Sequence, residues 1–153
     1  MYKFLFLVYT IARKYKNNNY TKIKGGFKLE LIEHIGEQTI KFNTPPTLLE
    51  TASIVGPKES QGPMAKYFDQ CIEDEFWGEK SWEKAESKFV KETVSTVISK
   101  SGINSSEIDY CFAGDLLNQC ISSSFGLREL NIPFFGVFGA CSTFIESMCL
   151  GSI

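Results

Sequence analysis

Two short apolar runs in the last third of the chain, residues 110–113 and 134–138, are each followed by glycine and then by a helix-like stretch. Short apolar runs that end in glycine are typical of buried strands. The strand–helix–strand–helix order predicts parallel strands joined by right-handed crossovers. This pattern limits the fold more than any other feature of the sequence, and it assigns the chain to the α/β class.

Two helices are expected beside these strands. The clearer one covers residues 81–101, where Ser81 can cap the N-terminus and Gly102 can end the helix. Its apolar residues recur at steps of three to five and predict one buried stripe. The stripe consists of Trp82, Ala85, Phe89, Val94, Val97 and Ile98. A second helix is predicted over residues 117–130.

The first half of the chain carries weaker signals. Residues 29–35 and 38–42 flank a glycine and predict a hairpin or two edge strands. Residues 51–55 predict a short strand, and the acidic segment 73–79 is expected to be exposed.

Charge divides the chain into two parts. Residues 1–29 hold seven of the sixteen basic residues and none of the eighteen acidic ones, so the net charge of −2 hides a basic tail and an acidic body. We therefore expect a basic tail outside the domain, residues 1–28, and a domain part, residues 29–153. The acidic body and the lack of a phosphate-binding loop argue against a nucleic-acid partner.

The tail has three interpretations. Its apolar run, residues 4–12, is too short to span a bilayer as a helix and lacks the features of a signal peptide. It could be a membrane-surface anchor, an ordered extra element, or an upstream extension that is not part of the working protein. We favour the extension, because Lys24-Gly25-Gly26 is what a ribosome-binding stretch would encode if translated, and the true start would then lie near Lys28 or Leu29.

The cysteines favour free thiols. Their number is odd and their spacing irregular, which indicates a reducing compartment and not a disulfide framework. They include no CxxC pair and have no histidine at ligand spacing, so the sequence predicts no metal site. The five are Cys71, Cys111, Cys120, Cys141 and Cys149.

Cys141 is the strongest candidate for chemistry. It follows the second apolar run after Gly139 and Ala140, and a helix is expected from Ser142 onward. The helix dipole and the free backbone N–H groups at such a position stabilise a thiolate. The two small residues allow a substrate to approach the backbone closely. The alternative is that Cys141 simply packs in the core, as most free cysteines do.

Other candidates lie elsewhere in the sequence. Asp115 or Asn118, in the turn after the first run, could line the same crevice, although we favour capping of the next helix by one of them. Cys111 and Cys149 are interpreted as core residues. His34 is the only histidine, and its pairing with Cys141 is a hypothesis, since a cysteine nucleophile needs a base.

Several motifs occur together in one order. They are Gly56-Pro57-Lys58-Glu59 with Gly62-Pro63, Lys80-Ser81-Trp82-Glu83 with Ala85-Glu86, Ala113-Gly114-Asp115-Leu116-Leu117-Asn118-Gln119, Ile132-Pro133-Phe134 and Phe138-Gly139-Ala140-Cys141-Ser142-Thr143. Together they resemble the stage V sporulation protein AD family of the thiolase-like superfamily. The resemblance covers residues 29–153, roughly the first third of that family's length, so we expect a truncated N-terminal fragment.

This resemblance implies a fold and a function. It implies an incomplete N-terminal βαβαβ half with a mixed, mainly parallel sheet, and a homodimer for the full-length protein. It also implies binding of dipicolinic acid, its uptake into the forespore and its release at germination, without a cofactor. Implied partners are dipicolinic acid and membrane proteins of the same operon, and the implied location is the spore interior, peripheral to the inner membrane.

The resemblance also implies site residues. Cys141 matches the acyl-accepting cysteine of thiolases, and Cys141, Gly139, Ser142, Asp115 and Asn118 are expected to contact the ligand. A thiolase-type or ketoacyl-synthase-type acyltransferase is the alternative function. Because the catalytic histidines of such enzymes come largely from the second half of the fold, we favour a non-enzymatic role. We expect the isolated chain to unfold with poor cooperativity and to bind no dipicolinate.

Overall fold

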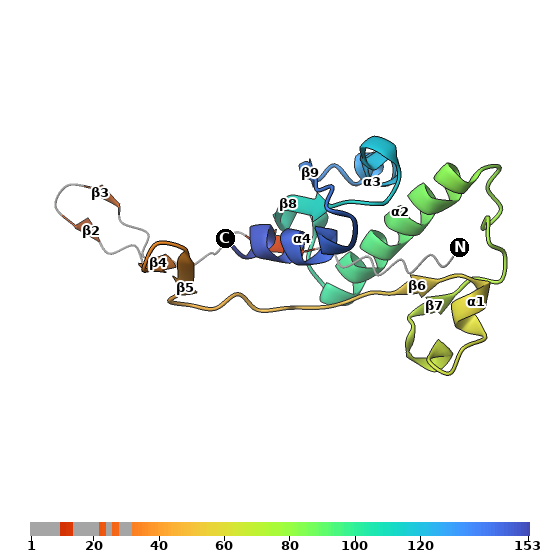
Figure 1. Ribbon diagram of the computed structural model, residues 1–153, viewed down its shortest axis with the longest axis horizontal. Coiled ribbons are helices and arrows are strands. Elements are labelled where there is room, and N and C mark those ends of the chain that lie inside the picture. Colours follow the sequence, from red (N-terminus) through yellow and green to blue (C-terminus); the bar gives the residue numbers. More distant parts are fainter. Residues whose placement is uncertain (1–9, 14–21, 24–25, 28–31) are drawn as a thin grey trace.

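The computed structural model describes residues 10–13, 22–23, 26–27 and 32–153, and within them it is an α/β structure (Figure 1). Its strands are β1 (Thr10–Arg13), β2 (Lys22–Ile23), β3 (Gly26–Phe27), β4 (Ile32–Ile35), β5 (Thr39–Phe42), β6 (Ile54–Val55), β7 (Gln70–Cys71), β8 (Ile108–Ala113) and β9 (Phe134–Gly136). Its helices are α1 (Pro57–Ser60), α2 (Trp82–Ser101), α3 (Ile121–Leu127) and α4 (Thr143–Ser152). Short 3-10 turns are η1 (Ala65–Tyr67), η2 (Ser105–Glu107), η3 (Asn118–Cys120), η4 (Arg128–Leu130) and η5 (Ala140–Ser142).

Strand β8 is the middle strand of a three-stranded sheet in the order β1-β8-β9. It pairs with β9 in parallel, with Cys111 opposite Phe134, and this confirms the predicted parallel strands. It pairs with β1 in the antiparallel direction, with Ile11 opposite Cys111. The sheet is therefore mixed, although β9 ends at Gly136 and is shorter than the apolar run that predicted it.

Helices α2 and α3 supply the buried partners of this sheet. Every second side chain of β8 points to the same face, and Cys111 and Ala113 lie in the core with α2 and α3. The core residues are Val90, Val94, Ile108, Cys111, Ala113, Leu127 and Ile132. A Cβ atom on Gly126 would lie 2.6 Å from the Ser87 carbonyl oxygen, so glycine at this position allows the close approach of α3 to α2.

Helix α2 has the ends that the sequence predicted. The Ser81 hydroxyl accepts a hydrogen bond from the Lys84 N–H at 3.4 Å, and Gly102 ends the helix with φ +66°. Ala85, Val94 and Val97 of the predicted stripe are buried. Phe89 and Ile98 of the stripe are half-buried. Trp82 is 46% exposed, and its ring packs on Phe76 with centroids 4.2 Å apart.

The predicted helix over residues 117–130 is divided into η3, α3 and η4. The division has a backbone cause, since Gln119 and Cys120 have φ values of +58° and +53° and cannot continue a right-handed helix. Asn131, at φ +52°, then ends η4. The regular α-helix is only the seven residues of α3.

The first half forms small separate sheets. The predicted hairpin is present as β4 and β5, with Ile32 opposite Phe42, although the predicted residues 29–31 lie outside the described part. Of the predicted strand 51–55, only β6 forms, and it pairs in parallel with β7. The extended segment between β5 and β6 reaches the end of α2, where Lys100 Nζ donates to the Thr51 carbonyl at 2.6 Å and to Asp69 Oδ1 at 2.7 Å.

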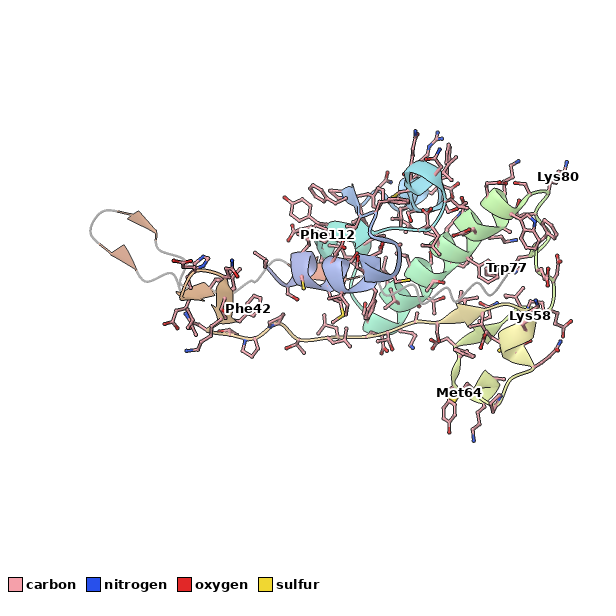
Figure 2. All side chains as sticks on the ribbon, viewed as in Figure 1. Phe42, Lys58, Met64, Trp77, Lys80 and Phe112 are labelled. Atoms are coloured by element: carbon pink, nitrogen blue, oxygen red, sulfur yellow. The ribbon has the colours of Figure 1, made fainter. Side chains whose placement is uncertain are left out.

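Helix α4 lies against β8 and β1. The second face of the sheet carries aromatic side chains, because Phe112 stacks on Phe135 at 5.3 Å and Tyr110 meets Phe135 edge-on at 5.5 Å. Figure 2 shows Phe112 on β8 close to α4.

Among the helices of the described residues, none combines the length and the apolar character that crossing a membrane requires.

Candidate functional site

The site is built from the turns that follow β8 and β9. Parallel strands end at the same edge of a sheet, so these turns are neighbours. Gly114, directly after β8, is in close contact with the second turn: a Cβ atom there would lie 1.8 Å from the Val137 carbonyl oxygen and 2.7 Å from Thr143 Cγ2. Only a residue without a side chain fits, so the two turns lie directly against each other.

Cys141 lies in η5, between β9 and α4, and its thiol is exposed. Ala140 has φ +50°, a left-handed conformation that turns the chain sharply before the cysteine. Helix α4 begins at Thr143, one residue later than the sequence analysis expected. Cys141 therefore precedes the helix within a 3-10 turn, and the alternative of a cysteine packed in the core is wrong for this residue.

Polar groups tie this turn to the first residues of α4. The Gly139 N–H donates to Thr143 Oγ1 at 3.0 Å, and the Ser142 N–H donates to the Gly139 carbonyl at 2.9 Å. The Ser142 hydroxyl lies 2.7 Å from the Gly139 carbonyl oxygen and also contacts the Glu146 carboxylate. The expected ligand residues Gly139 and Ser142 are thus in one hydrogen-bonded loop with Cys141 at its centre.

Glu146 is a member of the site that the sequence analysis missed. Its carboxylate contacts Ser142, and a Cβ atom on Gly139 would lie 2.3 Å from Glu146 Oε1. The signal was available, because residues four apart in a helix lie on one face. A carboxylate here opposes the positive end of α4 and weakens the attraction of the turn for an anion.

Asp115 shapes the first turn. Its side chain is 5% exposed, Oδ1 accepts from the Leu117 N–H at 2.9 Å, and Oδ2 accepts from the Ser123 N–H at 2.8 Å. The capping alternative is therefore confirmed for Asp115. Asn118 is exposed in η3. Direct contact of either residue with a ligand stays a prediction.

Backbone strain gathers in the same two turns. Five described non-glycine residues have positive φ, and three of them are Gln119, Cys120 and Ala140. Cys120 is held from the other turn, since its buried thiol lies 3.6 Å from the Val137 carbonyl oxygen. Unfavourable φ values persist only where the surroundings impose them, and they cluster at binding and catalytic sites. This observation supports the site independently of the cysteine.

The remaining candidates lie apart from Cys141. Cys111 is buried as predicted, and burial raises the pKa of its thiol to about 12. Cys149 is exposed, so its interpretation as a core residue is wrong. It lies two turns along α4, on the outward side that also carries Ile145 and Leu150.

His34 lies on the exposed hairpin, opposite Ile40, and no hydrogen bond joins it to Cys141. Across the described residues, no cluster of three or more His, Cys, Asp or Glu side chains is arranged to hold a metal ion.

Comparison with known proteins gives one consistent match. Residues 36–153 match the family described as stage V sporulation protein AD (SpoVAD). The stage V sporulation protein AD of Bacillus subtilis (strain 168) is 37% identical over 117 residues, which cover 76% of this chain and 35% of that protein. The chain thus spans about a third of the length of this curated relative. Both turns and all five expected ligand residues lie within residues 36–153.

Proposed function

Because this chain belongs to the stage V sporulation protein AD family, we propose that it serves sporulation by supplying one wall of a dipicolinic acid pocket. The observation that carries the proposal is that the family match includes both turns of the site, with Cys141 exposed in the second turn. Dipicolinic acid is a small aromatic dianion, and backbone N–H groups at the start of a helix bind carboxylates.

The proposed action is binding and delivery. The Cys141 turn would contact the ligand while membrane proteins of the same operon move it into the forespore, and release would follow at germination. The proposed location is the spore interior at the inner membrane, and the full-length form is proposed to be a homodimer of thiolase-like architecture. The exposed thiol of Cys141 and the left-handed backbone of Ala140, φ +50°, support a ligand contact at this turn.

A chimera tests this proposal. Residues 36–153 replace the matching part of the Bacillus subtilis protein, and dipicolinate binding is measured by calorimetry. We expect the chimera to bind, whereas Cys141→Trp in the chimera weakens binding more than tenfold by filling the turn. Cys149→Trp is the matched control, since that thiol is also exposed but lies on α4, beyond the Cys141 turn. Equal binding by the two tryptophan variants would sink the proposal, and the isolated chain is expected to show no binding.

Acyl transfer is the second candidate, and one observation favours it. Cys141 has an exposed thiol at a strand-to-helix turn, whereas Cys111 and Cys120 are buried. In this reaction the Cys141 thiolate attacks the carbonyl of a thioester, the acyl group forms a new thioester with Sγ, and the original thiol leaves. Mass spectrometry of the chimera after incubation with acetyl-CoA distinguishes the two functions. An acetyl group on Cys141, absent from Cys141→Ser, supports transfer, and an unmodified Cys141 rejects it.

A further inference from the structure

Thr143, the first residue of α4, touches both turns of the site with one side chain. Its hydroxyl oxygen Oγ1 accepts a hydrogen bond from the Gly139 N–H at 3.0 Å. Its methyl carbon Cγ2 lies against Gly114, since a Cβ atom built there would be only 2.7 Å away. Thr143 therefore joins the turn after β8 to the turn that carries Cys141, although it is not among the expected ligand residues.

Threonine is the residue type that can make both contacts at once. Its hydroxyl and methyl groups share one Cβ atom, and a β-branched side chain in a helix has few accessible χ1 angles. The hydrogen bond of the hydroxyl therefore also sets where the methyl group lies. Serine in this position keeps the acceptor oxygen and loses the methyl group, whereas valine keeps the shape and loses the acceptor.

The bend before Cys141 is held from within by these bonds. Gly139 has φ −123° and ψ +19°, and Ala140 follows it with φ +50°. A left-handed conformation is unfavourable for alanine and persists only where the surroundings impose it. The Gly139 N–H is held by Thr143, and the Gly139 carbonyl accepts from the Ser142 N–H at 2.9 Å. Both polar groups of Gly139 are therefore paired inside the turn.

The chain is also fixed on the other side of the bend. The Val137 N–H donates to the Ala113 carbonyl at 2.8 Å, and the Val137 carbonyl oxygen lies against Gly114. Val137 before the cysteine and Thr143 after it thus contact the same glycine of the first turn. The residues between them, 138–142, are fixed at both ends, and Cys141 is among them.

We propose that Thr143 is the positioning residue of the Cys141 turn. Its hydroxyl fixes the bend at Gly139, and its methyl group fixes the distance to the turn after β8. This inference rests on the proposed ligand contact at Cys141 and deepens it, because it assigns Gly139 a different part. Since the Gly139 N–H is already paired, Gly139 meets a ligand through its Cα atom and not as a hydrogen-bond donor.

Thr143→Val and Thr143→Ser separate the two contacts in the 153-residue chain. Valine removes only the acceptor, so we expect the Gly139 N–H to exchange with solvent at least tenfold faster, as measured by NMR. We also expect a change of at least threefold in the iodoacetamide alkylation rate of Cys141 divided by that of Cys149. Cys149 is an exposed thiol on α4, and its rate reports any general loosening of the helix. Serine keeps the acceptor and should stay within twofold of the parent in both measurements.

Three results would overturn the positioning role. They are a valine variant that matches the parent, a serine variant as altered as the valine variant, and an equal change at Cys141 and Cys149. The second would mean that packing of the methyl group explains the effect, and the third that the helix as a whole has loosened. The same exchange measurement in the chimera decides where a variant of the short chain does not fold.

Dipicolinate binding by the chimera connects the turn to the ligand. We expect Thr143→Val to weaken binding at least fivefold and Thr143→Ser to weaken it less than twofold. Binding of parent strength by the valine chimera would show that Thr143 does not position the turn for the ligand. If the chimera with Thr143 binds no dipicolinate, the proposed function fails, while exchange and alkylation still decide the role of Thr143.

Discussion

Gly114 rests against the Val137 carbonyl, with only 1.8 Å available between that oxygen and the position of a Cβ atom. The turn after β8 and the residues that lead to Cys141 are therefore one packed unit. Any change that separates them moves the backbone on which the thiol sits. The position of Cys141 depends in this way on a glycine 27 positions earlier in the sequence.

Gly114→Ala should therefore damage both stability and the site. The obstructing atom is backbone, which cannot rotate away, and overpacking of this kind costs about 1–3 kcal/mol or more. We expect a matching decrease in the free energy of unfolding in urea, together with a changed alkylation rate of Cys141. Gly56→Ala is the control, because nothing lies within 4 Å of its Cβ position and its φ is −83°. Similar losses in both variants would show that the contact with Val137 is unimportant.

Asp115→Ala should destabilise the turn after β8 through its backbone. The substitution leaves the N–H groups of Leu117 and Ser123 without their acceptors, and an unpaired buried donor costs about 1–3 kcal/mol. Asp115→Asn keeps one acceptor oxygen and should lose less. Urea unfolding checks the order of the two variants, with Asp109→Asn on the preceding strand as the control. A larger loss for asparagine than for alanine would contradict the capping role.

Glu146→Gln should strengthen dipicolinate binding in the chimera. Glutamine keeps an oxygen that can accept from Ser142 but removes a negative charge beside Gly139. Repulsion between one charge and a dianion several ångströms away in water is about 1 kcal/mol, or roughly fivefold in affinity. Calorimetry at low salt measures the change, and Glu75→Gln, in an exposed acidic loop, is the control. Weaker binding by the Glu146 variant would mean that the carboxylate helps to hold the ligand.

Local signals in the sequence predicted the elements of the fold well. Ser81 and Gly102 mark the ends of α2, and the apolar runs mark β8 and β9, because caps, stops and short-range patterns act within a few residues. Burial was harder to predict. Trp82 packs on Phe76 outside the core and stays half exposed. Cys149 lies on the outward face of α4 together with Ile145 and is exposed there. Such outcomes depend on which other elements reach a given face.

Pairing over long sequence distances could not be predicted. Nothing near Ile11 indicates that it lies opposite Cys111, a hundred residues later. Within the site, the exposed Cys141 and the capping by Asp115 agree with sequence reasoning, whereas Glu146 was missed although its spacing from Ser142 was visible. The left-handed residues Gln119 and Cys120 were not predictable, since neither type favours positive φ and the surrounding turn imposes it.

Lys100→Met should change the acid stability of the chain. The hydrogen bond from Lys100 holds the pKa of Asp69 below its ordinary value of 3.8, and the same bond raises the pKa of Lys100. Asp69 therefore stabilises the fold above pH 3.8, and this contribution is lost as the pH falls below that value. We expect Lys100→Met to lower Tm at pH 7 by about 1–3 °C, since partly exposed ion pairs contribute little, and to differ less from the parent near pH 2, where the bond to the Thr51 carbonyl is what remains. Calorimetry at both pH values checks this, and an equal difference at both would contradict it.

Cys111→Val should make the free energy of unfolding depend less on pH in the alkaline range. Burial raises the pKa of Cys111 from 9.0 to about 12, so the folded state keeps its proton in a range where the unfolded state has lost it. The stabilisation is complete below pH 9.0 and is lost as the pH rises toward 12, at up to about 1.4 kcal/mol per pH unit. Other side chains titrate in the same range, but they are shared by both proteins, so the difference between them isolates Cys111. Urea unfolding at pH 8, 9 and 10 should give a steeper decline for the parent, and parallel declines would show that the thiol is accessible to water.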